Sequence, residues 1–181
     1  MSRRKARGSE TERMILAAGE FYAMQGIGWV AKHEPPVKMT RSRGLIHVGK
    51  SDPDFLGHWR GRFFALEAKE VTSRPSLRVD EAHFSRGQAE RLVRVARSGG
   101  DALLIVFFKL KITERRGVVR EAFLLAADKD PLCAHCPISR WAIRGEGGSL
   151  NMDWFREHAI SVPEDDMGLA WGRALDQYGR R

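Results

Sequence analysis

The sequence predicts an α/β protein, α+β by strict sorting, in which a mixed central β-sheet is flanked by helices. Residues 101–110 are a continuous apolar run, which is typical of a strand buried on both faces. Two segments, 10–25 and 84–98, repeat apolar residues at helical spacing. Residues 54–59 and 62–69 are short β-rich runs that follow each other closely.

The first fifty residues are predicted to hold a helix, a strand and a basic projection. Residues 1–9 are expected to be a flexible basic arm. The helix over 10–25 ends near Gly26, and its apolar stripe is Met14, Ile15, Ala18, Phe21 and Tyr22. Residues 27–32 favour a strand, which the Glu-Pro-Pro sequence after it would stop. Segment 37–50 contains no acidic residue and is expected to be a basic loop or protruding hairpin.

The rest of the chain continues the α+β pattern. Gly61 marks the turn between the two β-rich runs, and residues 70–82 are expected to be a polar connection. Gly99 and Gly100 form a C-terminal stop for the second helix. A further strand is predicted over 120–127.

Residues 128–181 are less regular and are expected to extend the same domain, whose core is 10–127. A helix is predicted over 167–178. The tryptophans of this region are predicted to be core or interface anchors: Trp141, Trp154 and Trp171.

Length and charge limit the possible functions. A chain of 181 residues and 20.5 kDa is expected to be one domain. The net charge is +8, of which residues 1–50 contribute +6, with 10 Lys and Arg against 4 Asp and Glu. This asymmetry favours a polyanionic partner, most simply nucleic acid. A basic protein without such a partner is the alternative.

Several classes of protein are disfavoured. No apolar run approaches the ~20 residues of a membrane span, and the N-terminus leads into no signal-peptide region, so a cytoplasmic protein is expected. The two cysteines, Cys133 and Cys136, are too few for a disulfide framework, and no second pair completes a zinc site. Phosphate-binding glycine motifs of nucleotide-driven motors are absent.

The chemistry is predicted to lie at Asp54, Glu67 and Lys69. Glu67 and Lys69 are two residues apart on a strand, so they share a face, and a hairpin can bring Asp54 beside Glu67. Two carboxylates with an intervening carbonyl make a hard oxygen site for Mg²⁺ or Mn²⁺. A neighbouring lysine can position or deprotonate water and offset phosphate charge. This set suits metal-assisted phosphodiester hydrolysis, although the same spacing also arises by chance on a solvated strand edge.

Six short motifs follow one another in order between about Gly8 and Ala127. They are Gly8-Ser-Glu-Thr-Glu12, the aromatic Tyr22, Ile27-Gly-Trp-Val-Ala-Lys-His-Glu-Pro-Pro-Val37, Asp54-Phe-Leu-Gly57, Gly61-Arg-Phe-Phe-Ala-Leu-Glu-Ala-Lys-Glu70 and Phe84-Ser-Arg-Gly-Gln88. The series resembles the motifs of the RecU-type Holliday junction resolvases, a branch of the PD-(D/E)XK nuclease superfamily. The resemblance implies a restriction-endonuclease-like core.

The resemblance implies a role for each residue that matches a motif. Asp54 and Glu67, with the Ala68 carbonyl, would hold the Mg²⁺ or Mn²⁺, and Lys69 would serve the attacking water. Two further side chains would assist, namely Glu12 as an extra carboxylate, directly or through water, and Gln88 as a group that orients water or phosphate. Glu12 could equally be a first-turn glutamate stabilised by the helix dipole, and Gln88 a hydrogen-bonding residue of a helix N-terminus.

The resemblance also implies contacts with branched DNA. Segment 37–50 occupies the place of the family's protruding stalk, though it is shorter, and its cations would contact phosphates: Lys38, Arg41, Arg43 and Lys50. Arginines recur at helical spacing and could form a second row of phosphate contacts or only a solvated helix face, namely Arg91, Arg94 and Arg97.

The function implied is a divalent-metal-dependent, structure-selective DNA endonuclease that resolves four-way junctions as a homodimer by symmetric paired nicks. Two alternatives stay open: another PD-(D/E)XK DNA nuclease of the restriction or repair type, and a non-catalytic architectural DNA-binding protein. An RNA substrate also stays open on charge alone.

Overall fold

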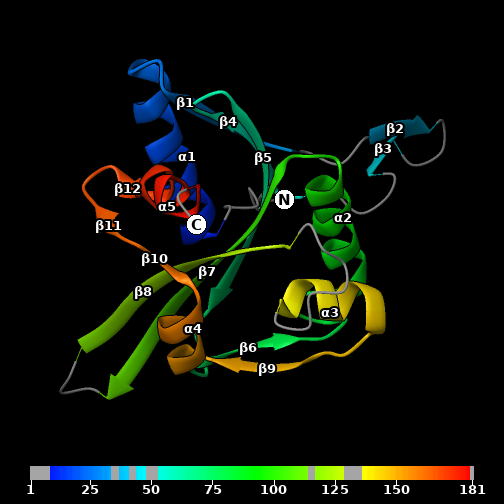
Figure 1. Ribbon diagram of the computed structural model, residues 1–181, viewed down its shortest axis with the longest axis vertical. Coiled ribbons are helices and arrows are strands. Elements are labelled where there is room, and N and C mark those ends of the chain that lie inside the picture. The colour runs from blue at the N-terminus through cyan, green and yellow to red at the C-terminus, as the bar shows by residue number, and fades with distance from the viewer. Residues whose placement is uncertain are drawn as a thin grey trace.

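The computed structural model describes residues 9–33, 37–40, 44–47, 53–113, 117–128 and 136–179. Over these residues the chain forms helices on both sides of a central sheet, which confirms the predicted fold class (Figure 1). The helices are α1 (Glu10–Met24), α2 (Arg86–Arg97), α3 (Pro137–Arg144), α4 (Met152–His158) and α5 (Trp171–Tyr178). The strands are β1 (Gly28–Lys32), β2 (Val37–Thr40), β3 (Gly44–His47), β4 (Phe55–Trp59), β5 (Arg62–Val71), β6 (Ser76–Val79), β7 (Asp101–Thr113), β8 (Gly117–Ala126), β9 (Gly148–Asn151), β10 (Ile160–Val162), β11 (Glu164–Asp165) and β12 (Gly168–Leu169).

The central sheet has six strands in the order β1-β4-β5-β7-β8-β10. The sheet is mixed because β5 and β7 pair in parallel, whereas the other neighbours pair in antiparallel fashion. Helix α2 makes the crossover between β5 and β7, as a parallel connection requires.

Strand β7 is buried on both faces, as its apolar sequence predicts. Leu104 and Val106 pack into a core formed with α2, α3 and α4. Leu103 and Ile105 point the other way and pack into a core formed with α1 and α5. The sheet therefore separates two apolar layers, and α1 and α5 cover the face opposite to α2 (Figure 1).

Helix α1 confirms the first predicted helix, and its apolar stripe explains its position. Its buried residues include Ile15, Ala18 and Tyr22. The Tyr22 ring meets the rings of Trp59 and Trp171 edge-on, with centroids 4.8 and 4.9 Å away. This aromatic cluster fixes α1 against the sheet and α5.

Glu10, in the first turn of α1, is held by two cations of the sheet. Its carboxylate pairs with Lys109 of β7 and lies 2.9 Å from the Arg120 guanidinium of β8. The hydrogen bond from Lys109, followed by that from Arg120, lowers the pKa of Glu10 below its ordinary value.

We expect Glu10→Gln to lower the free energy of unfolding by about 1 kcal/mol at pH 7. A depressed pKa in the folded state means that this contribution is present above the unfolded pKa, near 4.5, and is lost as the pH falls through the folded pKa. Urea unfolding at pH 7 and pH 3.5 should show the difference from wild type shrinking in acid. Glu20→Gln, at an exposed position of the same helix, is the matched control. An equal loss of unfolding free energy at both pH values would show that the charge of Glu10 does not provide this stability.

The basic segment 37–50 contains the predicted hairpin. Strands β2 and β3 pair in antiparallel register from Val37 opposite His47 to Thr40 opposite Gly44, and the hairpin stands away from the body of the molecule (Figure 1). Arg41, Arg43 and Lys50 lie outside the described residues, as do residues 1–8 of the predicted arm.

The sequence interpretation was wrong about the regularity of two regions. The polar connection 70–82 contains β6, which pairs with β9 from Ser76 opposite Asn151 to Val79 opposite Gly148. The region after residue 128 contains three helices and β10, an edge strand of the main sheet. The helix predicted over 167–178 begins only at Trp171, because the β11–β12 turn, with Gly168 at φ +115°, precedes it.

The prediction that the tryptophans of the C-terminal region anchor the core is confirmed. Trp141 and Trp171 are buried and donate their indole N–H groups to the carbonyl oxygens of Phe84 and Ile15. Trp154 is partly buried and packs against the same core as Trp141. Among the described residues, no helix is both long and apolar enough to cross a membrane.

Candidate active site

The β4–β5 hairpin brings Asp54 to Glu67. Phe55, the first residue of β4, pairs with Leu66 of β5, so Asp54 lies at the end of β4 beside Glu67. The Asp54 Oδ2 atom accepts a hydrogen bond of 2.9 Å from the backbone N–H of Ala68. This contact fixes the Asp54 carboxylate against the strand that carries Glu67, as the hairpin prediction requires.

Glu67 is a buried carboxylate, with 2% of its surface exposed. Burial, and after it the negative charge of Asp54, raise the pKa of Glu67 to about 7, whereas Lys69 opposes the shift. The two carboxylates therefore repel each other in a site that water reaches poorly. A cation placed between them would offset both the repulsion between the carboxylates and the cost of burying the Glu67 charge.

Lys69 lies on the same face of β5 as Glu67, as predicted. Its Nζ atom is 2.8 Å from Glu67 Oε1 and donates a hydrogen bond of 3.2 Å to Gln88 Oε1. Gln88 Nε2 in turn donates a hydrogen bond to Glu67 Oε1. The ammonium group also lies over the Phe84 ring, 5.8 Å from its centroid. Lys69, Glu67 and Gln88 thus form a closed ring of polar contacts.

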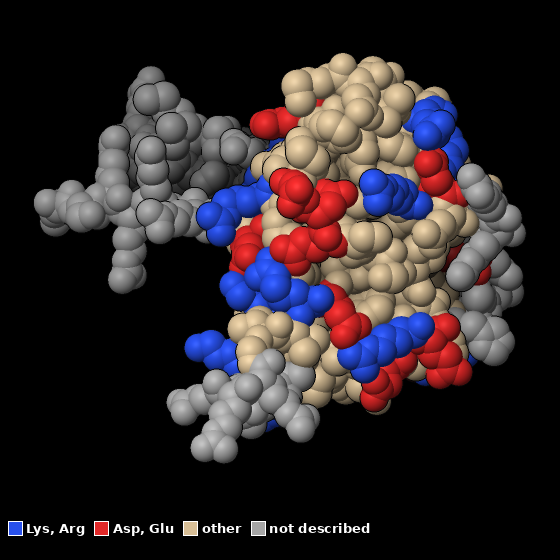
Figure 2. All heavy atoms as spheres, turned by 90° about the vertical axis from the view of Figure 1, so that its left-hand side faces the viewer, with Lys and Arg blue, Asp and Glu red and all other residues tan. Residues whose placement is uncertain are grey.

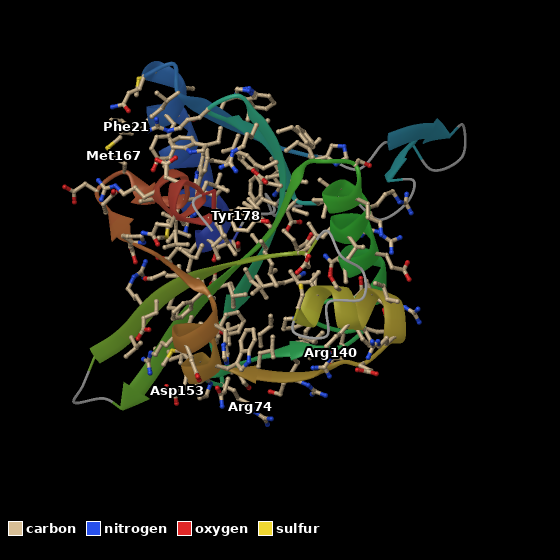
Figure 3. The ribbon with its side chains drawn as sticks, viewed as in Figure 1. Phe21, Arg74, Arg140, Asp153, Met167 and Tyr178 are labelled. Carbon is tan, nitrogen blue, oxygen red and sulfur yellow. The ribbon has the colours of Figure 1, made fainter. Side chains whose placement is uncertain are left out.

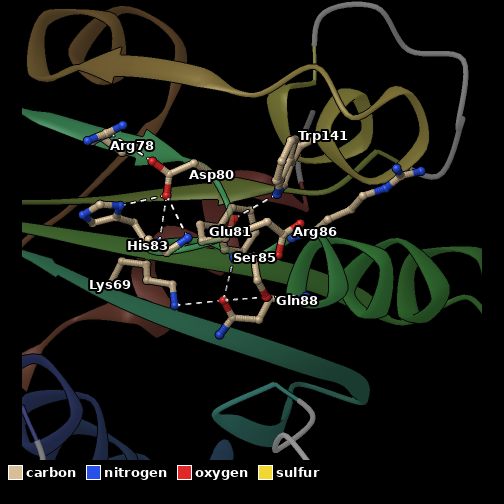
Figure 4. Close-up of polar contacts among 11 residues, drawn as sticks. Lys69, Arg78, Asp80, Glu81, His83, Ser85, Arg86, Gln88 and Trp141 are labelled. Carbon is tan, nitrogen blue, oxygen red and sulfur yellow. Dashed lines mark hydrogen bonds and ion pairs between the residues drawn. The ribbon is translucent and has the colours of Figure 1, made fainter.

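Gln88 combines the two roles that sequence reasoning held apart. It is the third residue of α2, where it forms a capping box with Ser85: the Ser85 hydroxyl accepts from the Gln88 N–H, and Gln88 Oε1 accepts from the Ser85 N–H. The same Oε1 atom accepts from Lys69 (Figure 4). The start of α2 therefore positions the lysine and the buried glutamate.

Exchanging Gln88 for glutamate separates these roles. We expect Gln88→Glu to keep the capping box but to place a carboxylate against Glu67, so that the DNA cleavage implied by the motif resemblance falls at least about tenfold. Ser85→Ala is the matched control, since it removes the cap, at about 1 kcal/mol, and leaves the Gln88 contacts to Glu67 and Lys69 in place. Cleavage rates and urea unfolding of both variants check this. Full activity in Gln88→Glu would assign Gln88 to the helix cap alone.

The structure does not bring Glu12 into this group. Glu12 Oε2 forms an ion pair of 2.5 Å with Lys32 Nζ of β1. In the described part of the chain, no three His, Cys, Asp or Glu side chains are close enough together to hold a metal ion. The role of Glu12 at the site thus stays a proposal.

A contact that sequence reasoning missed joins α1 to the same strand. Thr11 is fully buried, and both its N–H and its hydroxyl donate to Glu70 Oε2, at 3.2 and 3.0 Å. Glu70 follows Lys69, so this contact fixes β5 just beyond the polar ring. A threonine in the first turn of a helix resembles an ordinary capping residue, so nothing in the sequence indicated a partner 59 residues away.

The donor set fits a hard divalent cation. Asp54 and Glu67 supply carboxylate oxygens, which Mg²⁺ and Mn²⁺ prefer. The pKa of Glu67 is raised by its burial and then by the charge of Asp54, and a cation at this site would favour the ionised carboxylate. Mg²⁺ commonly keeps several waters and takes only one or two protein carboxylates. Two carboxylates therefore suffice for this kind of site.

The predicted arginine stripe lies on α2. Arg94 and Arg97 are exposed and stand in its last turn, where they also complement the helix dipole. Arg91 is partly buried. These positions are compatible with either a row of phosphate contacts or a solvated helix face.

Comparisons with known proteins agree with the resemblance seen in the motifs. The family model described as RecU, Recombination protein U, matches residues 6–115. A Streptococcus gordonii protein named Holliday junction resolvase RecU is 25% identical over 169 residues, which cover 88% of this chain and 76% of the relative. A protein of the same name from Geobacillus thermodenitrificans is 26% identical over 183 residues, covering 96% of this chain and 74% of the relative. The family match spans more than half of the chain, which therefore belongs to the RecU family.

Proposed function

We propose that this protein is a divalent-metal-dependent DNA endonuclease that resolves four-way junctions by paired symmetric nicks. Membership of the RecU family and the names of its relatives support a junction-resolving nuclease. The observation that carries the catalytic part is the buried Glu67 beside Asp54, with the Lys69 ammonium 2.8 Å from Glu67 Oε1.

Asp54 and Glu67 would hold the Mg²⁺ or Mn²⁺, with the Ala68 carbonyl as a further ligand. Bound there, the ion would activate water and neutralise charge on the phosphodiester. Asp54 is oriented for this by the Ala68 N–H, and Glu67 by Gln88 and Lys69. Both carboxylates are thus held in place before substrate binds, which limits the reorganisation that catalysis requires.

Lys69 would act on the water and the phosphate. Its ammonium donates to Gln88 and faces Glu67, so its position is set by two side chains. From there its positive charge would orient the attacking water, favour loss of the water's proton, and stabilise the negative charge that develops at the phosphate. Gln88 would orient water or phosphate beside it, and Glu12 would add a carboxylate from α1.

The basic hairpin would engage the junction. Strands β2 and β3 project from the body (Figure 1), and we propose that Lys38, Arg41, Arg43 and Lys50 contact phosphates near the branch point. Arg91 and Arg94 of α2 would add contacts along an arm. Such contacts are largely independent of sequence and weaken steeply with salt.

Paired nicks in a two-fold-symmetric substrate require two active sites, so we propose a homodimer. Trp29 and Phe63, both 48% exposed, lie in one row across the sheet because each pairs with His58. They give the chain exposed apolar surface of the kind that homodimer interfaces bury. Light scattering of the purified protein should give twice 20.5 kDa.

The function is tested by offering the wild-type protein a labelled four-way junction, linear duplex, flap and single strand in Mg²⁺. Preferential cutting of the junction is expected. Equal cutting of all duplex substrates would indicate a general nuclease of the same chemistry. Tight junction binding with no cutting in either Mg²⁺ or Mn²⁺ would indicate an architectural protein.

A further inference from the structure

We propose that a groove beside the candidate active site, running from Lys69 along the β5–β6 connection, binds the DNA backbone next to the phosphate that is cut. This inference rests on the proposed function, because it extends that site by a second set of phosphate contacts. It assigns a function to Arg74, Arg78 and His83, which neither the motifs nor the hairpin includes.

The groove is a cavity of about 780 Å³. It begins at Lys69 and is lined by residues 72–74 of the connection, by Ser76 and Arg78 of β6, by His83 and by Ser149 of β9. Lys69 lines the groove and also contacts Glu67, so the groove and the carboxylate site share this side chain. A strand whose scissile phosphate lies at Lys69 would therefore place its neighbouring phosphates in this groove.

The lining has the chemistry that phosphates require. It carries the cationic side chains of Lys69, Arg74 and Arg78, together with His83 and hydroxyl groups of the connection and of Ser149. Such side chains, with arginine foremost, make most phosphate contacts in protein–DNA complexes. Arg74 is exposed at the surface near β6 (Figure 3), and among the described residues no ion pair or hydrogen bond engages it. It is thus available for a ligand.

Arg78 and His83 are positioned by a common carboxylate. Asp80 accepts from Arg78 Nε at 3.0 Å and lies 2.8 Å from His83 Nδ1 (Figure 4). Two backbone N–H groups, of Ala82 and His83, also bind Asp80. The network holds Arg78 and His83 in place at the groove, which reduces the entropy lost when a phosphate binds.

The lining also contains one acidic side chain, which is held by the start of helix α1. Glu70 lines the groove, but its carboxylate accepts two hydrogen bonds from Thr11 at the start of α1. In contrast, the cations on the α1–α5 face are interspersed with acids (Figure 2), and Arg120 there is bound by Glu10 and Glu164. In the groove, Lys69 and Arg78 each face one carboxylate, of Glu67 and Asp80, whereas Arg74 faces none among the described residues.

The test compares the salt dependence of junction binding in EDTA, where cleavage does not interfere. In Arg74→Ala/Arg78→Ala, two phosphate contacts are lost, so the slope of log affinity against log salt should become shallower by about two. The affinity ratio between 50 and 200 mM salt then shrinks about tenfold. Arg74→Lys/Arg78→Lys, which keeps both charges, should retain most of the wild-type slope.

Arg173→Ala, an exposed arginine of α5 on the other side of the sheet, is the control for loss of charge. An unchanged slope in the double variant, or an equal change in Arg173→Ala, would overturn the groove assignment. Arg74→Ala alone, a change at an exposed side chain, repeats the test if the double variant is unstable. This test is independent of the test of the proposed function. Wild-type protein that cuts no junction would contradict the nuclease function, whereas the salt dependence of binding decides whether the groove binds DNA.

Discussion

Asp54→Asn is expected to reduce junction cleavage by at least about a thousandfold, equivalent to about 4 kcal/mol of transition-state stabilisation. Loss of groups that only support a metal ligand costs about 10- to 100-fold, so loss of the ligand charge itself should cost more. Asparagine keeps an oxygen that can accept from the Ala68 N–H, so the hairpin should fold as before.

The measurement is the single-turnover cleavage rate in Mg²⁺, with junction affinity and urea unfolding measured in parallel. Asp153→Asn makes the same chemical change at a side chain that is 82% exposed on α4, and it should cut like wild type. Affinity within a few-fold of wild type is expected for Asp54→Asn. Combined loss of binding and of folding would mean that Asp54 is structural.

Lys69→Met should lower the cleavage rate by about a hundred- to ten-thousandfold, the usual range for a group that transfers protons in the transition state. Methionine fills a similar volume but removes the charge that faces Glu67 and the hydrogen bond to Gln88. Because the change affects the chemical step, saturating DNA should not restore the rate.

Lys111→Met is the matched control for this change, at an exposed position of β7. Comparing the two variants at saturating junction separates a lost catalytic group from a lost phosphate contact. A defect in Lys69→Met that disappears at high DNA concentration would make Lys69 a binding residue only.

Local patterns in the sequence predicted the elements that build the site. The two β-rich runs on either side of Gly61 indicate a hairpin, and a hairpin places Asp54 beside Glu67 without information from elsewhere in the chain. Strand β7 was predictable because burial on both faces leaves an uninterrupted apolar run.

The missed elements depend on partners that are distant in sequence. Strand β6 has only four residues, and it is a strand because β9, more than 65 residues later, pairs with it. Its Leu77 and Val79 alternate with polar residues, a weak signal that becomes meaningful only once the core beneath them is known. The Glu70–Thr11 contact was hidden for the same reason.

Gln88 shows a different limit of sequence reasoning. The motif offered two readings of this residue, a helix cap or a member of the site. Both contacts exist in the structure, because one amide has an oxygen for Ser85 and Lys69 and a nitrogen for Glu67. Residue type and spacing alone do not reveal that a single side chain serves both.

The most direct test of the account uses a four-way junction labelled on two opposing strands and wild-type protein freed of metal with EDTA. Restoring Mg²⁺ or Mn²⁺ should produce nicks at symmetric positions in both strands, and no cutting should occur before the metal is added. Cutting that persists in EDTA, or an intact junction in both metals, would contradict a metal-dependent resolvase built on Asp54, Glu67 and Lys69.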